Sequence, residues 1–184
     1  ANREEATTED RAEMAKLAAE GVRAGAFGFS TSRLLQHRTA EGEPIPSYGA
    51  AQEELLEIAD ALAEVGRGWI QTVGDFEDEI DAEFDLRREM AARSGLPLTM
   101  TLLQKEARPE EWRELLSRIE AANAEGLKIT AQIRGRPTSV LLGFELSINP
   151  FSACPSWSEV KELDFEGRIV RLRDPALRAR LISE

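Results

Sequence analysis

One unit recurs along the chain and constrains its fold more than any other feature: an amphipathic helix that ends at a glycine and is followed by a short strand-like run. The glycines are Gly25, Gly66, Gly95 and Gly126, and the runs after them predict strands near residues 26–31, 69–73, 98–103 and 128–133. Strict alternation with short connections requires right-handed crossovers between parallel strands. The pattern therefore predicts an α/β fold with parallel strands in sequential order.

Four strands do not close a barrel, so an open four-stranded sheet and half of an eight-stranded barrel both agree with this pattern. Polar residues within the runs, such as Gln71, Thr99 and Gln132, favour a barrel wall or an edge over the centre of an open sheet. Half a barrel would leave two open edges and, we expect, an exposed apolar inner face. We therefore predict that the chain self-associates.

Composition narrows the function classes. No run among the 184 residues is long and apolar enough to cross a bilayer, and no basic leader precedes the first helix, so we expect no membrane partner and a cytoplasmic location. The net charge of -11 repels phosphate backbones, which argues against nucleic acid as a partner. With Cys154 and His37 as its single cysteine and histidine, the chain has no internal disulfide and no Cys/His zinc cluster. A metal site here would have to rest on carboxylates.

A resemblance to a known family begins in AGAFGFSTSRLLQHRT, residues 24–39. This string resembles the strand and loop of N-acyl-D-amino-acid deacylases of the amidohydrolase superfamily (amidohydrolase family 3), and the similarity continues through residues 53–76, 94–104 and 122–151. The resemblance implies an internal fragment that corresponds to barrel strands four to seven. We therefore expect a partial (β/α)8 TIM barrel over residues 1–150, followed over residues 151–184 by a turn-rich segment and a C-terminal helical tail of the same domain.

The resemblance implies a hydrolase that cleaves the amide of small N-acyl-D-amino acids, with zinc generating the attacking hydroxide in the full-length parent. This sequence departs from the family where histidine ligands are expected: strand five ends at Val73, and strand six carries Leu102 and Leu103, followed by Gln104 in place of a lysine. We therefore expect no metal, no cofactor and no activity in this chain alone. A metal-free pseudoenzyme or binding barrel and a freestanding α/β interaction domain remain as alternatives.

The candidate substrate-binding residues follow the strands, where this fold binds its ligands. They are Ser30, Ser32, Arg33, His37, Asp75, Arg134 and Arg136. Each also has a structural interpretation: loop capping for the serines, a surface loop for His37, and exposed cations for Arg134 and Arg136. The acidic run that ends at Glu83 is interpreted as the solvated first turns of a helix. No catalytic residue is assigned, and Cys154 is expected to be inert.

Overall fold

The computed structural model describes residues 4–74, 80–105, 108–136 and 139–184. These residues form two compact units, and each is described on its own. The sheet unit comprises Ala1–His37 and Pro46–Pro137, and the tail unit comprises Arg38–Ile45 and Thr138–Glu184. The sheet unit thus ends before the expected boundary at residue 150, and the tail unit takes in a loop from the first quarter of the chain.

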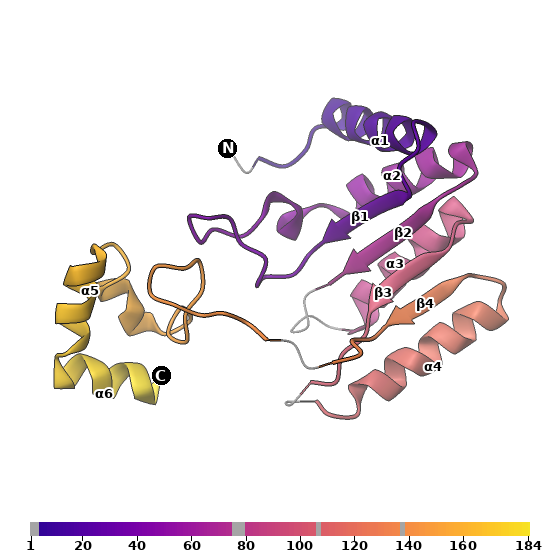
Figure 1. Cartoon of the computed structure of the whole chain (residues 1–184). Coiled ribbons are helices and arrows are strands. Elements are labelled where there is room, and N and C mark those ends of the chain that lie inside the picture. Colours follow the sequence, from indigo (N-terminus) through magenta and orange to yellow (C-terminus); the bar gives the residue numbers. More distant parts are fainter. Residues whose placement is uncertain (1–3, 75–79, 106–107, 137–138) are drawn as a thin grey trace. The chain divides into compact units, whose positions relative to one another are not determined.

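The sheet unit alternates helix and strand from end to end (Figure 1). Its elements are α1 (Thr8–Arg23), β1 (Gly28–Ser32), the 3-10 turn η1 (Pro46–Gly49), α2 (Gln52–Val65), β2 (Trp69–Val73), α3 (Ile80–Ser94), β3 (Leu98–Thr101), α4 (Glu111–Ala124) and β4 (Ile129–Gln132). All three strand pairs are parallel, and the order across the sheet is β1-β2-β3-β4. The predicted α/β class, parallel pairing and sequential order are confirmed.

Local signals in the sequence explain where helices begin and end. The first N-cap is Thr7. Its hydroxyl accepts from the Asp10 N–H at 3.1 Å, while the Asp10 carboxylate accepts from the Thr7 N–H at 3.0 Å. Helix α2 ends at Gly66, whose φ of 69° lies in the left-handed region that glycine adopts without strain. Gly28 serves a different purpose, because a Cβ there would lie 1.9 Å from the carbonyl oxygen of Trp69.

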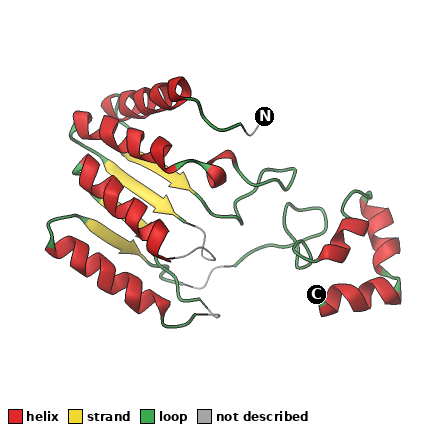
Figure 2. Cartoon of the chain, turned by 180° about the vertical axis from the view of Figure 1, so that it is seen from behind, coloured by secondary structure: helices red, strands yellow, loops and turns green. Residues whose placement is uncertain are grey.

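The apolar side chains of the strands point toward the helices. Figure 2, seen from behind the view of Figure 1, shows helices in front of the strands. Ile70, Leu98, Met100 and Ile129 are at most 1% exposed and form one core with residues of the helices. This burial gives most of the stabilisation, since a fully buried side chain of this size contributes about 1.5–3 kcal/mol.

The opposite face of the sheet is polar across its centre, although Trp69 and Val73 of β2 also lie on it. Strand alternation places Ser30, Gln71, Thr99 and Thr130 on that face, and these four residues stand in register across the sheet. They are exposed or half-buried, whereas their strand neighbours Ile70, Leu98 and Ile129 are buried. The expectation of an apolar inner face is therefore wrong, because the apolar half of each strand is already buried by the helices. The sheet offers hydroxyl and amide groups instead.

The outer edge of β4 is partly closed by the helix that precedes it. The Asn123 side chain donates to the Ile129 carbonyl and accepts from the Ile129 N–H, both at 2.8 Å. These two bonds reproduce what a neighbouring strand would offer at that residue.

The tail unit contains a 3-10 turn η2 (Pro155–Glu159) and two helices, α5 (Phe165–Leu172) and α6 (Pro175–Ser183). The helical tail expected from the sequence consists of two helices, because Asp174 caps α6 with an acceptor for the Ala176 N–H at 2.9 Å and Pro175 starts the new helix. A small core holds Trp157, Val160, Leu177 and Leu181.

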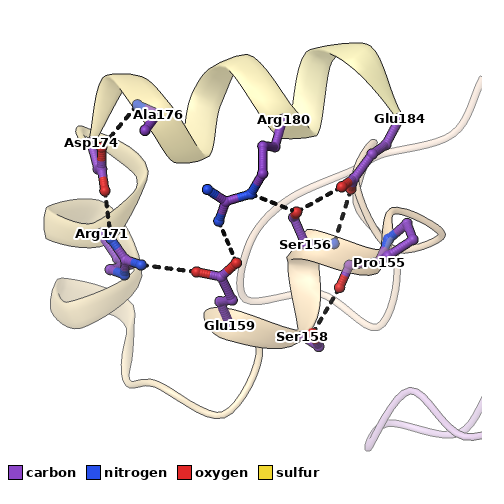
Figure 3. A network of polar contacts seen from close by, with 9 residues as sticks. All are labelled: Pro155, Ser156, Ser158, Glu159, Arg171, Asp174, Ala176, Arg180 and Glu184. Carbon is purple, nitrogen blue, oxygen red and sulfur yellow. Dashed lines mark hydrogen bonds and ion pairs between the residues drawn. The ribbon is translucent and has the colours of Figure 1, made fainter.

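Polar contacts join the three elements of the tail unit (Figure 3). Glu159 of η2 bridges Arg171 of α5, at 2.8 Å, and Arg180 of α6. The Glu184 carboxylate accepts from the Ser156 N–H at 2.9 Å and from its hydroxyl at 2.7 Å. The loop 38–45 folds back on itself through an antiparallel bridge between Arg38 and Pro44. Over the described residues, no helix has the length and apolarity needed to cross a membrane.

Candidate functional site

The carboxyl ends of the parallel strands gather the polar groups of the sheet unit. Ser30 donates a hydrogen bond to the side-chain oxygen of its register partner Gln71. Two residues further along β1, the Ser32 hydroxyl lies 2.6 Å from Nδ1 of His37 and accepts from the Leu34 N–H at 3.3 Å. Two candidate residues that the sequence treats separately, Ser32 and His37, therefore form a pair. His37 itself is exposed.

A buried cluster of charges lies beside these hydroxyls. Arg33, directly after β1, places Nη1 3.2 Å from Glu83 Oε1, and Arg87 places Nη2 3.2 Å from Glu83 Oε2. Arg87 Nε also donates to the Thr72 hydroxyl at 3.2 Å. The side chains are 21%, 12% and 9% exposed for Arg33, Glu83 and Arg87 respectively. One carboxylate thus serves two guanidinium groups, and the cluster carries a surplus positive charge.

Two features show how tightly this cluster is built. A Cβ on Gly74, the residue after β2, would lie 2.1 Å from Arg87 Nη2 and 2.6 Å from Glu83 Oε2, so a larger residue there would displace the ends of both side chains. Burial lowers the pKa of Arg87; the positive charge of Arg33 adds to this effect and the negative charge of Glu83 opposes it. The ion pair with Glu83 therefore keeps Arg87 charged in a poorly solvated place.

Arg33 retains unused hydrogen-bonding capacity. Its buried Nε has no acceptor, and its Nη1 approaches Glu83 at ion-pair distance without hydrogen-bond geometry. A buried N–H without an acceptor is unusual and marks a place where a further polar group would be stabilising. The guanidinium of Arg33 can thus receive a carboxylate or carbonyl oxygen.

The remaining candidates lie elsewhere. Arg134 and Arg136 follow β4 and are exposed. Asp75 lies outside the described residues. The sequence did not identify Glu83 and Arg87 as site residues. Glu83 was interpreted as the end of a solvated acidic run, and Arg87 lies beyond that run. Their spacing of four residues on one helix was the available signal, because it permits an ion pair on one face.

A second ion cluster follows β3. Glu111, at the start of α4, has a side chain only 4% exposed and pairs with Lys105 and with Arg108, the latter at 2.9 Å. Gln104 donates to the Pro109 carbonyl at 3.2 Å. These contacts hold Lys105 and Arg108 against the start of α4.

The donor set of the described residues does not fit a metal ion. Over those residues, no three His, Cys, Asp or Glu side chains form a group that could hold one. Where the resemblance would place histidines, Leu102 is 6% exposed and Leu103 lines an apolar hollow with Trp112 and Leu116. Zinc needs about three nitrogen, sulfur or carboxylate ligands that converge on one point.

Parallel strands in sequential order, helices on one face and polar groups at the carboxyl ends define a segment of a (β/α)8 barrel. The model of the amidohydrolase family matches residues 1–184. The chain therefore belongs to the amidohydrolase family, as its resemblance to N-acyl-D-amino-acid deacylases implies.

Solved structures similar to this chain are D-aminoacylases. Two of them each align with a TM-score of 0.57 at 24% identity, over 73% of this chain and 27% of theirs. One is a D-aminoacylase variant in complex with CuCl2, and the other is a D-aminoacylase described by the functional role of its binuclear metal centre. A third, described as defining a novel subset of amidohydrolases, aligns with a TM-score of 0.54 at 23% identity, over the same shares. At these identities the likeness shows the fold, a partial barrel. The chain spans about a quarter of the length of these proteins. No curated protein matches the chain.

Proposed function

We propose that this chain is part of a metal-dependent amidohydrolase that cleaves carbon–nitrogen amide bonds outside peptides, such as those of N-acyl-D-amino acids. The family match over the whole chain carries the proposal. The D-aminoacylase neighbours support it, and one of them is described by a binuclear metal centre. They do not favour a metal-free barrel or a freestanding interaction domain. The proposal includes zinc in the full-length parent, a small-molecule substrate and a cytoplasmic location.

In this proposal the metal ligands come from the part of the barrel outside residues 1–184, and the present segment binds the substrate. A bound metal would activate water and polarise the amide carbonyl. The unpaired Nε of Arg33 supports a role in holding the substrate carboxylate, because the Arg33–Glu83–Arg87 cluster has one positive charge in excess. The hydroxyls of Ser30 and Ser32 would face the amide of the substrate, and His37 would hold the Ser32 hydroxyl through their contact.

Arg134, Arg136 and Asp75 complete the proposed substrate-binding set. The exposed position of Arg134 and Arg136 after β4 suits long-range attraction of an anionic substrate more than a fixed contact. Asp75 directly follows Gly74 in the sequence and enters the set on that ground alone.

The test compares two proteins: residues 1–184 alone, and the longest chain that the coding sequence provides. Both are incubated with a panel of N-acetyl-D-amino acids, and released amine is measured before and after chelation and zinc restoration. We expect turnover from the longer chain only, lost with the chelator and restored by zinc. Near one equivalent of zinc retained by residues 1–184 after dialysis, or turnover by them that a chelator abolishes, would contradict this assignment.

The role of Arg33 is tested in the longer chain by Arg33→Met. Because a charged hydrogen bond contributes about 1.5–3 kcal/mol, we expect KM to rise roughly tenfold to a hundredfold with a smaller change in kcat. Arg33→Lys should recover part of the loss, and the surface variant Arg93→Met should leave KM unchanged. An unchanged KM in Arg33→Met would remove Arg33 from the binding set.

A further inference from the structure

The tail unit contains a pocket of about 540 Å³ between the loop 38–44 and the segment 144–168. This volume lies within the range of small-molecule sites. Half-buried Phe144 gives it apolar surface, and the Trp157 ring stacks against Phe144 with centroids 5.7 Å apart. Trp157 is only 7% exposed, so this wall is fixed by the core of the unit.

Two arginines line the pocket with their charges uncompensated. Arg38 donates through Nη1 to the Gly42 carbonyl at 2.9 Å, and Arg168 donates to the Phe144 carbonyl and, at 2.6 Å, to the Lys161 carbonyl. In each guanidinium the Nε is buried without an acceptor. Across the described residues, neither arginine has a carboxylate within ion-pair distance. Backbone carbonyls hold the two groups in place but cannot neutralise them.

The same pocket carries carboxylates that these arginines do not reach. Its charged lining residues are Arg38, Glu41, Glu43, Glu145, Lys161, Glu162 and Arg168. Glu162 pairs with Lys161 at 3.7 Å. Glu41 and Glu145 are exposed, and in the described part of the chain neither forms an ion pair with a cation. Positive groups held in place and negative groups at the rim thus share one pocket without cancelling each other.

We propose that this pocket binds a zwitterionic α-amino acid with an apolar side chain. The carboxylate is held by the guanidinium groups of Arg38 and Arg168, the ammonium faces Glu41 and Glu145, and the side chain packs on Phe144. A polyanion such as a phosphate ester fits less well, because the lining carboxylates outnumber the cations. A simple amine fits less well because it would leave both buried Nε groups unsatisfied.

The ligand class is tested on the 184-residue chain by titration calorimetry and saturation-transfer NMR. D-leucine and L-leucine are compared with 4-methylpentanoate, which lacks the ammonium, and with isopentylamine, which lacks the carboxylate. We expect at least one leucine enantiomer to bind and both truncated compounds to bind at least about tenfold more weakly. A truncated compound that binds as tightly as leucine would overturn the proposal, as would no signal from either enantiomer at about 20 mM.

The position of the site is tested by Arg38→Gln, Arg168→Gln and Glu145→Gln. The matched control is Arg171→Gln on the same helix as Arg168. Glu159 and Asp174 hold the Arg171 guanidinium at 2.8 and 2.7 Å (Figure 3), and Arg171 does not line the pocket. We expect each arginine variant at the pocket to weaken leucine binding about tenfold or more and the control to leave it unchanged. Circular dichroism verifies folding, and Glu145→Gln, at an exposed rim position, keeps the test valid should an arginine variant unfold. Equal losses in the control, or unchanged binding in every folded pocket variant, would refute the site.

Discussion

Replacing Glu83 by glutamine should destabilise the sheet unit far more than any other single charge removal on α3. Among the described residues, Glu83 is the only carboxylate within ion-pair distance of Arg33 and Arg87, and its own side chain is 12% exposed. Glutamine has nearly the same shape, so the change removes charge without opening a cavity. Two guanidinium groups would then remain in a poorly solvated space with no negative partner.

The magnitude follows from that imbalance. Removing one partner of a buried ion pair costs about 3–5 kcal/mol, and a retained neutral hydrogen bond from the glutamine oxygen offsets about 1 kcal/mol of it. We therefore expect the free energy of unfolding to fall by about 2–4 kcal/mol. Arg87 is the more deeply buried of the two arginines, with a side chain 9% exposed, so most of the loss arises there.

The assay is urea unfolding of the 184-residue chain at neutral pH, with midpoint and slope compared between variants. Glu89→Gln is the control, since Glu89 also pairs with an arginine on α3, at 2.7 Å, but is 46% exposed and should contribute little. Adding Arg33→Gln to Glu83→Gln should recover part of the loss, because one uncompensated charge is removed. If the Glu83→Gln variant is no less stable than the Glu89→Gln variant, the view that the cluster is electrostatically coupled is refuted.

Three further outcomes are expected. Gly28→Ala should lower the free energy of unfolding by about 2 kcal/mol or more, because the new Cβ would overlap the Trp69 carbonyl. Gly21→Ala, in open space on α1, should raise it by about 0.5–1 kcal/mol, and the midpoints of urea unfolding measure both changes. The pKa of Asp174 is lowered from 3.8 by the Ala176 N–H and then by Arg171, so the stability it gives is present above that value and is lost as the pH falls through the lowered pKa. The difference in Tm between the native chain and Asp174→Asn should therefore shrink from pH 7 to about pH 3, and a constant difference would contradict this. The edge of β1 and the part of the β4 edge beyond Ile129 still predict self-association, which a monodisperse monomer in light scattering at high concentration would disprove.

The strand order was predictable because each of the four helices of the sheet unit ends near a glycine. After that glycine the apolar residues change from helical spacing to the spacing of a strand. The boundaries were less predictable, since strand pairing ends where the neighbour ends. The run expected over residues 98–103 stops at Thr101, the last residue of β3 in register with β4, although the Leu102 N–H still donates to the Gln132 carbonyl at 3.0 Å. Such an end depends on the partner strand, which local sequence does not describe.

The candidate site was predictable only in part. Ser32 and Arg33 were identified because they follow the strand predicted over residues 26–31, and the end of a strand can be recognised without knowing its tertiary contacts. Glu83 was interpreted as solvated, and its burial depends on Gly74 leaving space at the end of a different strand. The contact between Ser32 and His37 likewise depends on a loop turn closed by the His37 N–H and the Leu34 carbonyl at 3.0 Å.

The amide of Asn123 has a consequence for how this sheet can be extended. Because its two bonds occupy both backbone groups of Ile129, a strand added beside β4 can begin its ladder only beyond that residue. A one-residue slip of such a strand would turn each of its side chains to the opposite face. Asn123 thus acts as a stop that limits the alignments open to an incoming strand, and it also shields the start of this edge from pairing with a foreign chain.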